Sequence, residues 1–217
     1  MNELNTIQNL AVWALPVILA ITVHEVAHGR VALQCGDTTA FTQGRLSLNP
    51  LHHIDPIGTV LVPAVLFFLG GFVFGWAKPV PVNYHQLRHP KRDMALVALA
   101  GPAANLIMAT VWALLFGLGL QLADTWPWVG KPLVYMGYAG IMVNSVLAVL
   151  NMLPVPPLDG SRVLAGLLPN GYGRWLARIE PYGLLILVVL MASDWLGKIL
   201  GPPVFWLSHA FISPFLA

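Results

Sequence analysis

Long apolar runs separated by short polar intervals dominate the sequence. A helix needs about 20 apolar residues to cross the hydrocarbon core of a bilayer, and four runs approach or exceed that length: residues 7–33, 94–122, 133–153 and 182–200. Residues 57–76 are also apolar, but they contain Pro63 and end in a glycine-rich stretch before a Val/Pro alternation, which favours extended backbone. The apolar tail, residues 202–217, is short and begins with two prolines, so we expect an interfacial or partial helix there.

This pattern predicts an all-α polytopic membrane protein with about four to six transmembrane helices. After the first helix we expect a re-entrant, partly β-like element over residues 57–82. Neither an internal repeat nor a separate soluble domain is visible, so residues 1–217 are expected to form a single membrane-embedded domain. The composition agrees, because 57% of the residues are hydrophobic and only 9% are charged, whereas about a quarter of a soluble domain is charged.

The distribution of Lys and Arg distinguishes two topologies for residues 57–76. If this segment crosses the bilayer, the cations divide about seven to four between the two sides. If it enters and returns on the same side, nine fall together and only Lys131 and Lys198 lie opposite. The second division fits better with the excess of Lys and Arg in cytoplasmic loops. We therefore expect an external N-terminus, a first helix that ends on the cytoplasmic side, and apolar runs in contact with the lipid bilayer.

Net charge and cysteine content argue against a nucleic-acid-binding surface and an intramolecular disulfide. The formal net charge is +2, without a basic run or interleaved basic and aromatic residues, so no surface for nucleic acid is expected. Cys35 is the only cysteine in the sequence, which excludes an intramolecular disulfide.

The motif His24-Glu25-Val26-Ala27-His28 lies inside the first apolar run. Residues four apart share one face of a helix, so both imidazoles can bind one Zn²⁺ while the intervening glutamate transfers protons. Ionisable groups in a membrane segment usually mark a functional site. A helix rises about 25 Å from residue 7 to residue 24, which puts this motif in the cytoplasmic half of the membrane.

A zinc site needs at least one further protein ligand, and Asp159 is the strongest candidate. It follows a stretch with three prolines, residues 154–157, after an apolar run that ends on the same side as His28. These prolines prevent a helix and give a rigid backbone that can orient an acid. In an alternative interpretation Asp159 caps the helix that follows it. Other candidate ligands on that side are Asp37, His52, His53, Asp55, Asp93 and Glu180.

Three motifs together resemble the site-2 protease family of intramembrane zinc metalloproteases. They are the HExxH motif, the sequence Gly101-Pro102-Ala103-Ala104-Asn105, and an N-x-x-P-x-P-x-L-D-G pattern at residues 151–160. The resemblance covers residues 21–161, and residues 75–83 resemble the membrane-dipping β element of that family. The sequence contains no PDZ or CBS module, so it resembles a minimal form of the family.

The resemblance implies a multi-pass protein of a prokaryotic cell membrane that hydrolyses peptide bonds in or near transmembrane segments. It implies one Zn²⁺ per chain, bound by His24, His28 and Asp159, with Glu25 as the general base and acid. Zinc lowers the pKa of a bound water and polarises the scissile carbonyl, and the glutamate takes the proton. The expected partner is a transmembrane protein substrate.

Asparagines in otherwise apolar helical sequence are candidate hydrogen-bond donors to the oxyanion of the transition state. Three residues qualify, Asn105, Asn144 and Asn151, and the resemblance favours Asn151 for this role. Hydrogen bonding between helices is an equally good interpretation of all three. His53 is a candidate for contact with Glu25 or Asp159, or for proton transfer, with a surface-loop histidine as the alternative.

Three alternative functions stay open. A metal transporter also places His and acidic residues in membrane helices, but further polar positions through the bilayer and often repeat symmetry accompany them. A catalytically silent binding protein of the same family can keep zinc, yet zinc binding alone does not need Glu25. Another class of membrane metalloprotease completes its site with a later glutamate, and only Glu180 is available for that position.

Overall fold

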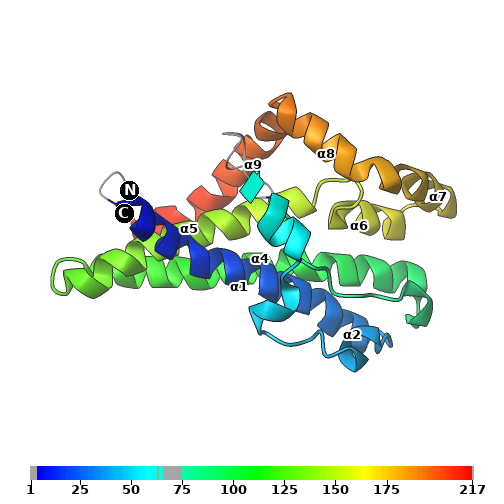
Figure 1. Cartoon of the computed structure of the whole chain (residues 1–217), viewed down its shortest axis with the longest axis horizontal. Helices are drawn as coiled ribbons and strands as arrows, with labels where there is room; N and C mark the ends of the chain where they lie inside the picture. Colours follow the sequence, from blue (N-terminus) through cyan, green and yellow to red (C-terminus); the bar gives the residue numbers. More distant parts are fainter. Residues whose placement is uncertain (1–3, 63, 66–74, 217) are drawn as a thin grey trace.

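The computed structural model describes residues 4–62, 64–65 and 75–216 (Figure 1). Within these residues the regular elements are helices, which confirms the all-α prediction. Three helices are long and apolar enough to cross a membrane: α1 (Thr6–Gln34), α4 (Pro90–Leu122) and α5 (Pro127–Asn151). They coincide with the first three predicted spans to within a few residues at each end.

Helices α4 and α5 form an antiparallel pair, and α1 packs against both (Figure 1). Two glycines of α5 allow the pair to approach closely. A Cβ at Gly137 would lie 2.7 Å from Phe116 Cβ, and a Cβ at Gly140 would overlap the Trp112 ring. Small residues at helix contacts are typical of membrane helix pairs. Trp112 and Phe116 pack with the fully buried Ile141 in the apolar core between the helices.

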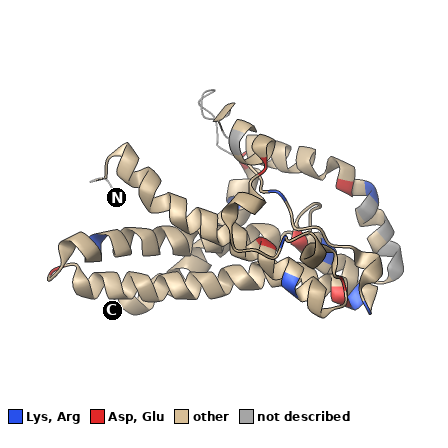
Figure 2. Cartoon of the chain, turned by 60° about the horizontal axis from the view of Figure 1, so that its bottom comes forward, with Lys and Arg blue, Asp and Glu red and all other residues tan. Residues whose placement is uncertain are grey.

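The outward faces of the helices are apolar. Large hydrophobic side chains stay exposed there, among them Ile107 at 66% and Trp206 at 73% of their surface. Water disfavours such a surface, whereas the hydrocarbon of a bilayer accommodates it. Most Lys and Arg positions gather at the end of the bundle where α1 ends and α4 begins (Figure 2). An apolar exterior with charges collected at one end suits a chain embedded in a bilayer.

The prediction of one continuous span at residues 182–200 was wrong. This run divides into α8 (Gly183–Ala192) and α9 (Trp195–Ile212), which are bent by 83° relative to each other. Asp194 between them has φ 59°, a left-handed conformation that interrupts the helix. The described residues therefore contain three candidate spans, or four if the bent pair counts as one.

The prediction for the tail also needs correction. Pro202 and Pro203 lie inside α9 and do not begin a separate partial helix. Proline is tolerated in membrane helices because neighbouring helices and local adjustments satisfy the freed backbone groups. Helix α9 returns along α5, and Phe215 packs directly on Gly117 of α4. The tail thereby closes one side of the bundle.

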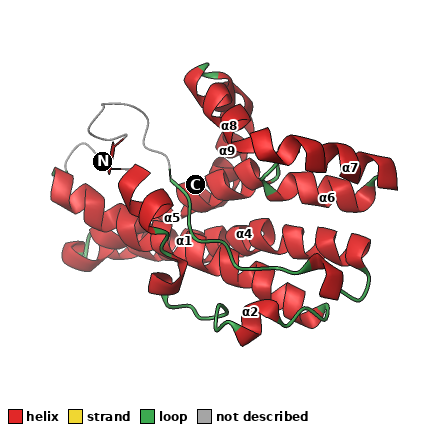
Figure 3. Ribbon diagram, turned by 45° about the vertical axis from the view of Figure 1, so that its right-hand side comes forward, coloured by secondary structure: helices red, strands yellow, loops and turns green. Residues whose placement is uncertain are grey.

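The described part of the connection between α1 and α4 consists mainly of short helices and the loop at residues 75–83 (Figure 3). These helices are α2 (Thr39–Thr42), the 3-10 helix η1 (Pro50–His53), the π-helix η2 (Pro56–Leu61) and the 3-10 helix η3 (Tyr84–Gln86). The described part of this connection contains no strand, so its predicted β-like character is not confirmed.

The two ends of the predicted re-entrant segment lie side by side. The Trp76 N–H donates to the Gly58 carbonyl at 3.0 Å, and Thr59 Oγ1 donates to the Trp76 carbonyl at 2.8 Å. Residues 66–74, which lie between these ends in the sequence, fall outside the described residues. The path of the segment itself therefore stays a prediction.

Candidate metal centre

His24 and His28 lie on the same face of α1, as their spacing predicts. Both side chains are buried, and their Nε2 atoms are 3.1 Å apart. Asn5 caps the beginning of α1 by accepting the Gln8 N–H at 2.9 Å. The helix then continues unbroken through both histidines, which gives the two imidazoles a rigid support.

Asp159 is the first residue of α6 (Asp159–Leu167) and lies directly opposite the two histidines. Its Oδ2 atom is 3.3 Å from the Nε2 atom of His24 and 3.3 Å from that of His28. The alternative interpretation of Asp159 as a helix cap is wrong, because the N-cap position is Leu158 and no side-chain capping hydrogen bond is present there. The carboxylate is buried and faces the histidines instead.

The start of α6 is fixed on both of its sides. Gly160 packs so closely on the Met152 carbonyl at the end of α5 that a Cβ would overlap it. On α6, Arg162 lies over the Tyr84 ring, with Cζ 5.6 Å from the ring centroid, and its Nη2 lies 3.6 Å from Glu180 Oε1. Burial raises the pKa of the Tyr84 hydroxyl. The close packing of Gly160 on the end of α5 fixes the position of Asp159, the residue before it.

The three ligand atoms fit a zinc ion. They form a nearly equilateral triangle with sides of 3.1, 3.3 and 3.3 Å. The ligand atoms of tetrahedral zinc lie about 3.3 Å apart when each bond is about 2.0 Å long. Asp159 Oδ2 is buried without a hydrogen-bond partner, which is costly for a carboxylate unless a cation neutralises it. Two imidazoles and a carboxylate are ordinary zinc ligands.

The other candidate ligands are engaged elsewhere or point away. Asp37, fully buried after α1, accepts the Asn83 N–H at 2.7 Å and the Thr39 N–H at 2.9 Å. Asp55 accepts the Gly58 N–H at the start of η2, and Asp93 accepts the His89 N–H at the start of α4. Glu180 pairs with Arg162, and His52 is exposed. Among the described residues only His24, His28 and Asp159 form a metal-ligand cluster.

One stripe of α4 supports both histidines. Val97, Gly101 and Asn105 follow each other at four-residue spacing on this helix. The Val97 carbonyl lies 2.7 Å from His28 Nδ1 and can only accept, so Nδ1 carries a proton, and in the neutral imidazole Nε2 keeps its lone pair. A Cβ at Gly101 would overlap His28 Nε2, so only glycine leaves room for the ligand atoms. This role of Gly101 and Val97 was not predicted, although the four-residue spacing of the two residues was a usable signal in the sequence.

The three predicted asparagines separate into two places. Asn105 and Asn144 are both fully buried behind His24, with Asn105 Oδ1 2.6 Å from His24 Nδ1. Asn105 Nδ2 donates to Asn144 Oδ1 at 2.9 Å. Asn151 lies at the end of α5, where its Nδ2 donates to the Leu147 carbonyl at 3.0 Å. Their predicted contact with an oxyanion stays a prediction.

Glu25 is half-buried beside the long loop between η2 and η3. Its Oε2 atom accepts the Val80 N–H at 2.8 Å. The loop is fixed near this point because the Lys78 N–H donates to the His53 carbonyl at 2.9 Å and Arg45 Nη2 donates to the Lys78 carbonyl at 3.0 Å. No local pattern predicts the Glu25–Val80 contact, since 55 residues separate the two partners.

His53 is buried and does not lie at the surface. Its Nε2 atom lies 2.9 Å from the Ser47 carbonyl, which accepts its proton. In the described part of the chain no hydrogen bond joins His53 to Glu25 or Asp159. It reaches the site only through its backbone, which holds Lys78 two residues before Val80. A functional role for its imidazole stays a prediction.

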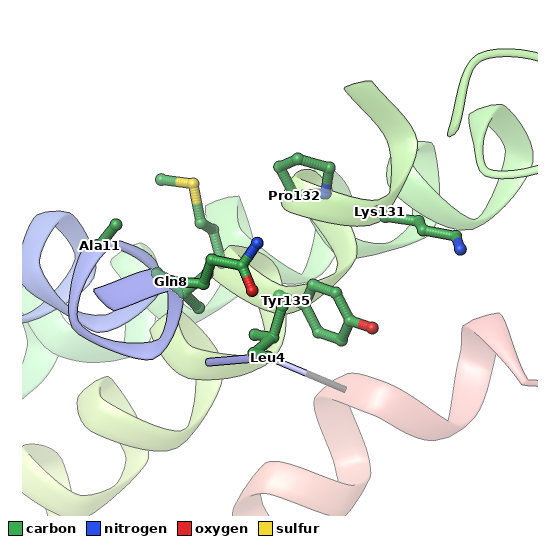
Figure 4. Close-up of a pocket in the computed structure, with 8 residues that line it drawn as sticks. Leu4, Gln8, Ala11, Lys131, Pro132 and Tyr135 are labelled. Atoms are coloured by element: carbon green, nitrogen blue, oxygen red, sulfur yellow. The ribbon is translucent and has the colours of Figure 1, made fainter. Parts of the chain in front are cut away.

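Two cavities are described, and the zinc-ligand candidates line neither. One, of about 410 Å³, lies between the beginnings of α1 and α5 (Figure 4), among Leu4, Gln8, Ala11, Lys131, Pro132 and Tyr135. The other, of about 450 Å³, lies beside η3 and the beginning of α4. The side chains of His24, His28 and Asp159 are all buried.

Known proteins with similar sequences carry names that describe a zinc metalloprotease, the activity expected from the sequence. The chain is 37% identical over 194 residues to "Putative zinc metalloprotease YwhC" of Bacillus subtilis strain 168, which covers 88% of this chain and 82% of that protein. It is 34% identical over 190 residues to "Putative zinc metalloprotease Rip2" of Mycolicibacterium smegmatis, which covers 87% of this chain and 70% of that protein.

A more distant similarity extends to an archaeon. The chain is 32% identical over 102 residues to "Putative zinc metalloprotease MJ0611" of Methanocaldococcus jannaschii, which covers 46% of this chain and 49% of that protein. No protein-family model matches the chain. No solved structure matches it. From the similarity to the two bacterial proteins over most of both lengths, the chain belongs to the site-2 protease-like family of zinc metalloproteases.

Proposed function

We propose that the chain is an intramembrane zinc metallo-endopeptidase that hydrolyses peptide bonds in or near transmembrane segments of other membrane proteins. The observation that carries this proposal is the buried triangle of ligand atoms from His24, His28 and Asp159. The two histidines belong to an apolar helix long enough to cross a bilayer, which supports a membrane setting for the reaction. The names of the relatives support zinc-dependent peptide hydrolysis as the reaction class.

The expected cofactor is one zinc ion per chain, held by His24 Nε2, His28 Nε2 and Asp159 Oδ2. When bound, zinc supplies a Lewis acid that lowers the pKa of water toward about 7 and polarises the scissile carbonyl. Glu25 takes the proton of the attacking water at its carboxylate and returns it to the leaving amine. The Val80 N–H occupies Oε2 and orients this carboxylate, which leaves Oε1 to accept the proton.

The proposed substrate must unwind before it is cut. In a transmembrane helix each peptide carbonyl already accepts a hydrogen bond from a residue four positions later, so an intact helix hides its scissile bonds. We place the site in the cytoplasmic half of the membrane, where nine of the eleven Lys and Arg residues fall together if residues 57–76 return to the side they entered. The contact between Gly58 and Trp76 supports this return.

Cysteine labelling tests the proposed orientation. In a Cys35→Ser background, cysteines introduced by Ile57→Cys and Arg88→Cys are expected to react with a membrane-impermeant thiol reagent from the cytoplasmic side. Both native side chains are exposed, so neither substitution disturbs the core. Lys131→Cys serves as the external reference. Reaction of positions 57 and 88 from opposite sides would show that the segment between them crosses the bilayer.

Cleavage by purified protein tests the proposed function. We expect detergent-purified protein to contain one zinc per chain, to cut single-span transmembrane peptides, to lose activity on chelation and to regain it with added zinc. Asp159→Asn should lower zinc content and cleavage together, because a neutral amide replaces an anionic ligand. A soluble peptide of matched length is the control for substrate class. Zinc-loaded protein that cuts no peptide but moves zinc across vesicle membranes would instead identify a transporter.

A further inference from the structure

We propose that Asn144 is a positioning residue for the zinc ligand His24, and that it acts through Asn105. The two amides form a directional relay that fixes the proton of His24 on Nδ1 and leaves the lone pair on Nε2. The inference rests on the proposed zinc site and extends it beyond the three ligands. The relay joins three helices, because His24 lies on α1, Asn105 on α4 and Asn144 on α5.

Two backbone carbonyls fix the orientation of the amides. Asn144 Nδ2 donates to the Gly140 carbonyl at 2.8 Å, one turn earlier on α5. Asn105 Nδ2 donates to the Ala20 carbonyl on α1 at 3.3 Å. A carbonyl oxygen can only accept, so neither amide can exchange its oxygen and nitrogen positions without placing two acceptors against each other. Each asparagine therefore has a fixed donor side and a fixed acceptor side.

The fixed orientation of the two amides determines which nitrogen of the His24 imidazole is protonated. Asn105 Nδ2 donates to Asn144 Oδ1 at 2.9 Å, so Asn105 presents Oδ1 to His24. The distance from this oxygen to His24 Nδ1 is 2.6 Å. Because an amide oxygen has no proton to give, His24 must donate from Nδ1. In the neutral imidazole Nε2 then carries the lone pair, and it faces Asp159 Oδ2 at 3.3 Å. Only this tautomer can bind a metal through Nε2.

Burial makes the relay effective. Asn105 and Asn144 are both 0% exposed, so water cannot replace a lost partner. The opposite tautomer would place an unprotonated Nδ1 2.6 Å from the Asn105 oxygen, with two lone pairs facing each other. His28 reaches the same protonation pattern directly, through the Val97 carbonyl. His24 has no backbone carbonyl at its Nδ1, so its orientation depends on the amide of Asn105 and on what holds that amide.

The same contacts weigh against an oxyanion role for these two residues. Asn105 Nδ2 has two hydrogens, and they are directed to the Ala20 carbonyl and to Asn144 Oδ1. Asn144 lies behind Asn105, with its Nδ2 on the Gly140 carbonyl. Neither side chain reaches a substrate without breaking the relay.

Zinc affinity of purified protein, measured by competition with a chelator of known affinity, tests the relay. We expect Asn105→Leu to weaken zinc binding by about 10- to 100-fold, and Asn144→Leu by about 10-fold. The double variant should bind zinc no more weakly than Asn105→Leu alone, because Asn144 acts only through Asn105. The matched control is Ser145→Ala, which removes a neighbouring, fully buried hydroxyl that has no hydrogen-bond partner.

The protonation of His24 gives a second readout that needs neither zinc nor proteolysis. Nitrogen NMR of metal-free, ¹⁵N-histidine-labelled protein, with the His24 signals identified from a His24→Gln sample, should show Nδ1–H in the unsubstituted protein. Asn144→Leu should give a mixture of the two tautomers. Additive losses of zinc affinity, an Asn144→Leu affinity equal to that of Ser145→Ala, or a neutral His24 with its proton on Nε2 and none on Nδ1 in the unsubstituted protein would each overturn the relay. Absence of peptide cleavage with the expected affinities and spectra would reject the proposed function and leave the relay standing.

Discussion

Glu25→Gln is expected to lower the rate of peptide cleavage by about 10³-fold while the protein keeps its zinc. Glutamine has nearly the same shape, and its amide oxygen can still accept the Val80 N–H that now lies 2.8 Å from Glu25 Oε2. The amide cannot take a proton from water, so proton transfer is lost although the position of the side chain is kept. Single-turnover cleavage of a transmembrane peptide, together with metal analysis of the same sample, measures both quantities.

The matched control for this variant is Glu180→Gln. Glu180 is the first residue of the 3-10 helix η4 (Glu180–Tyr182) and pairs with Arg162 of α6 at 3.6 Å, with both side chains partly exposed, so its substitution removes a carboxylate outside the metal centre. We expect its cleavage rate to stay within about 2-fold of the unsubstituted protein, because exposed ion pairs contribute little. Cleavage that persists in Glu25→Gln would exclude Glu25 as the base. Loss of zinc in Glu25→Gln would mean that Glu25 supports the ligands instead.

Gly101→Ala is expected to abolish zinc binding, and activity with it. The added Cβ would overlap His28 Nε2 and lie 2.5 Å from His24 Cε1. The imidazoles cannot turn away freely, because their Nδ1 atoms are held by Val97 and Asn105 on the same helix. Such overpacking costs about 1–3 kcal/mol of stability. Here the steric overlap would involve the ligand atoms themselves. Zinc content after purification and affinity by chelator competition measure the loss, which we expect to exceed about 100-fold.

Gly197→Ala is the matched control for Gly101→Ala, because it adds the same methyl group to a helix away from the metal centre. Gly197 also lies in a helix, α9, but no atom lies within 4 Å of the position that its Cβ would take. Alanine there should leave zinc affinity unchanged and improve helix propensity slightly. If Gly101→Ala bound zinc as tightly as the unsubstituted protein, α4 would have to be able to move away from α1, and the close contact would not define the site.

Much of the candidate site could be predicted from local pattern. The four-residue spacing of His24 and His28 is a property of any helix, and their position in an apolar run marked them as functional. Asp159 could be selected because the prolines before it exclude a helix and because the charge pattern put it on the same side as His28. The described helices α1, α4 and α5 likewise follow the apolar runs, since hydrophobicity over about 20 residues is a local quantity.

Other features depend on residues that are remote in sequence. His24 and Asn105 are 81 residues apart, and Asn105 and Asn144 are 39 residues apart, so no local pattern pairs them. The break at Asp194 also escaped prediction, because one residue with φ 59° changes the direction of an apolar run without changing its hydropathy. Residues 57–82 were also hard to predict. They combine glycine and proline with apolar residues, and such a sequence permits several backbone paths.

The sequence by itself determined which chemical groups are available and on which helix face each one lies. Periodicity and composition are enough for that, because both follow from the geometry of one element. Only the tertiary structure decided which residues contact those groups. Val97 and Asn105 lie at the Nδ1 atoms of the two imidazoles, Gly101 packs against both rings, and the Val80 N–H donates to Glu25. These partners depend on how α1, α4 and the loop before α4 pack, and packing sums many weak contacts over the whole chain. The sequence therefore predicted the candidate zinc ligands, whereas the packing decided the orientation of their side chains.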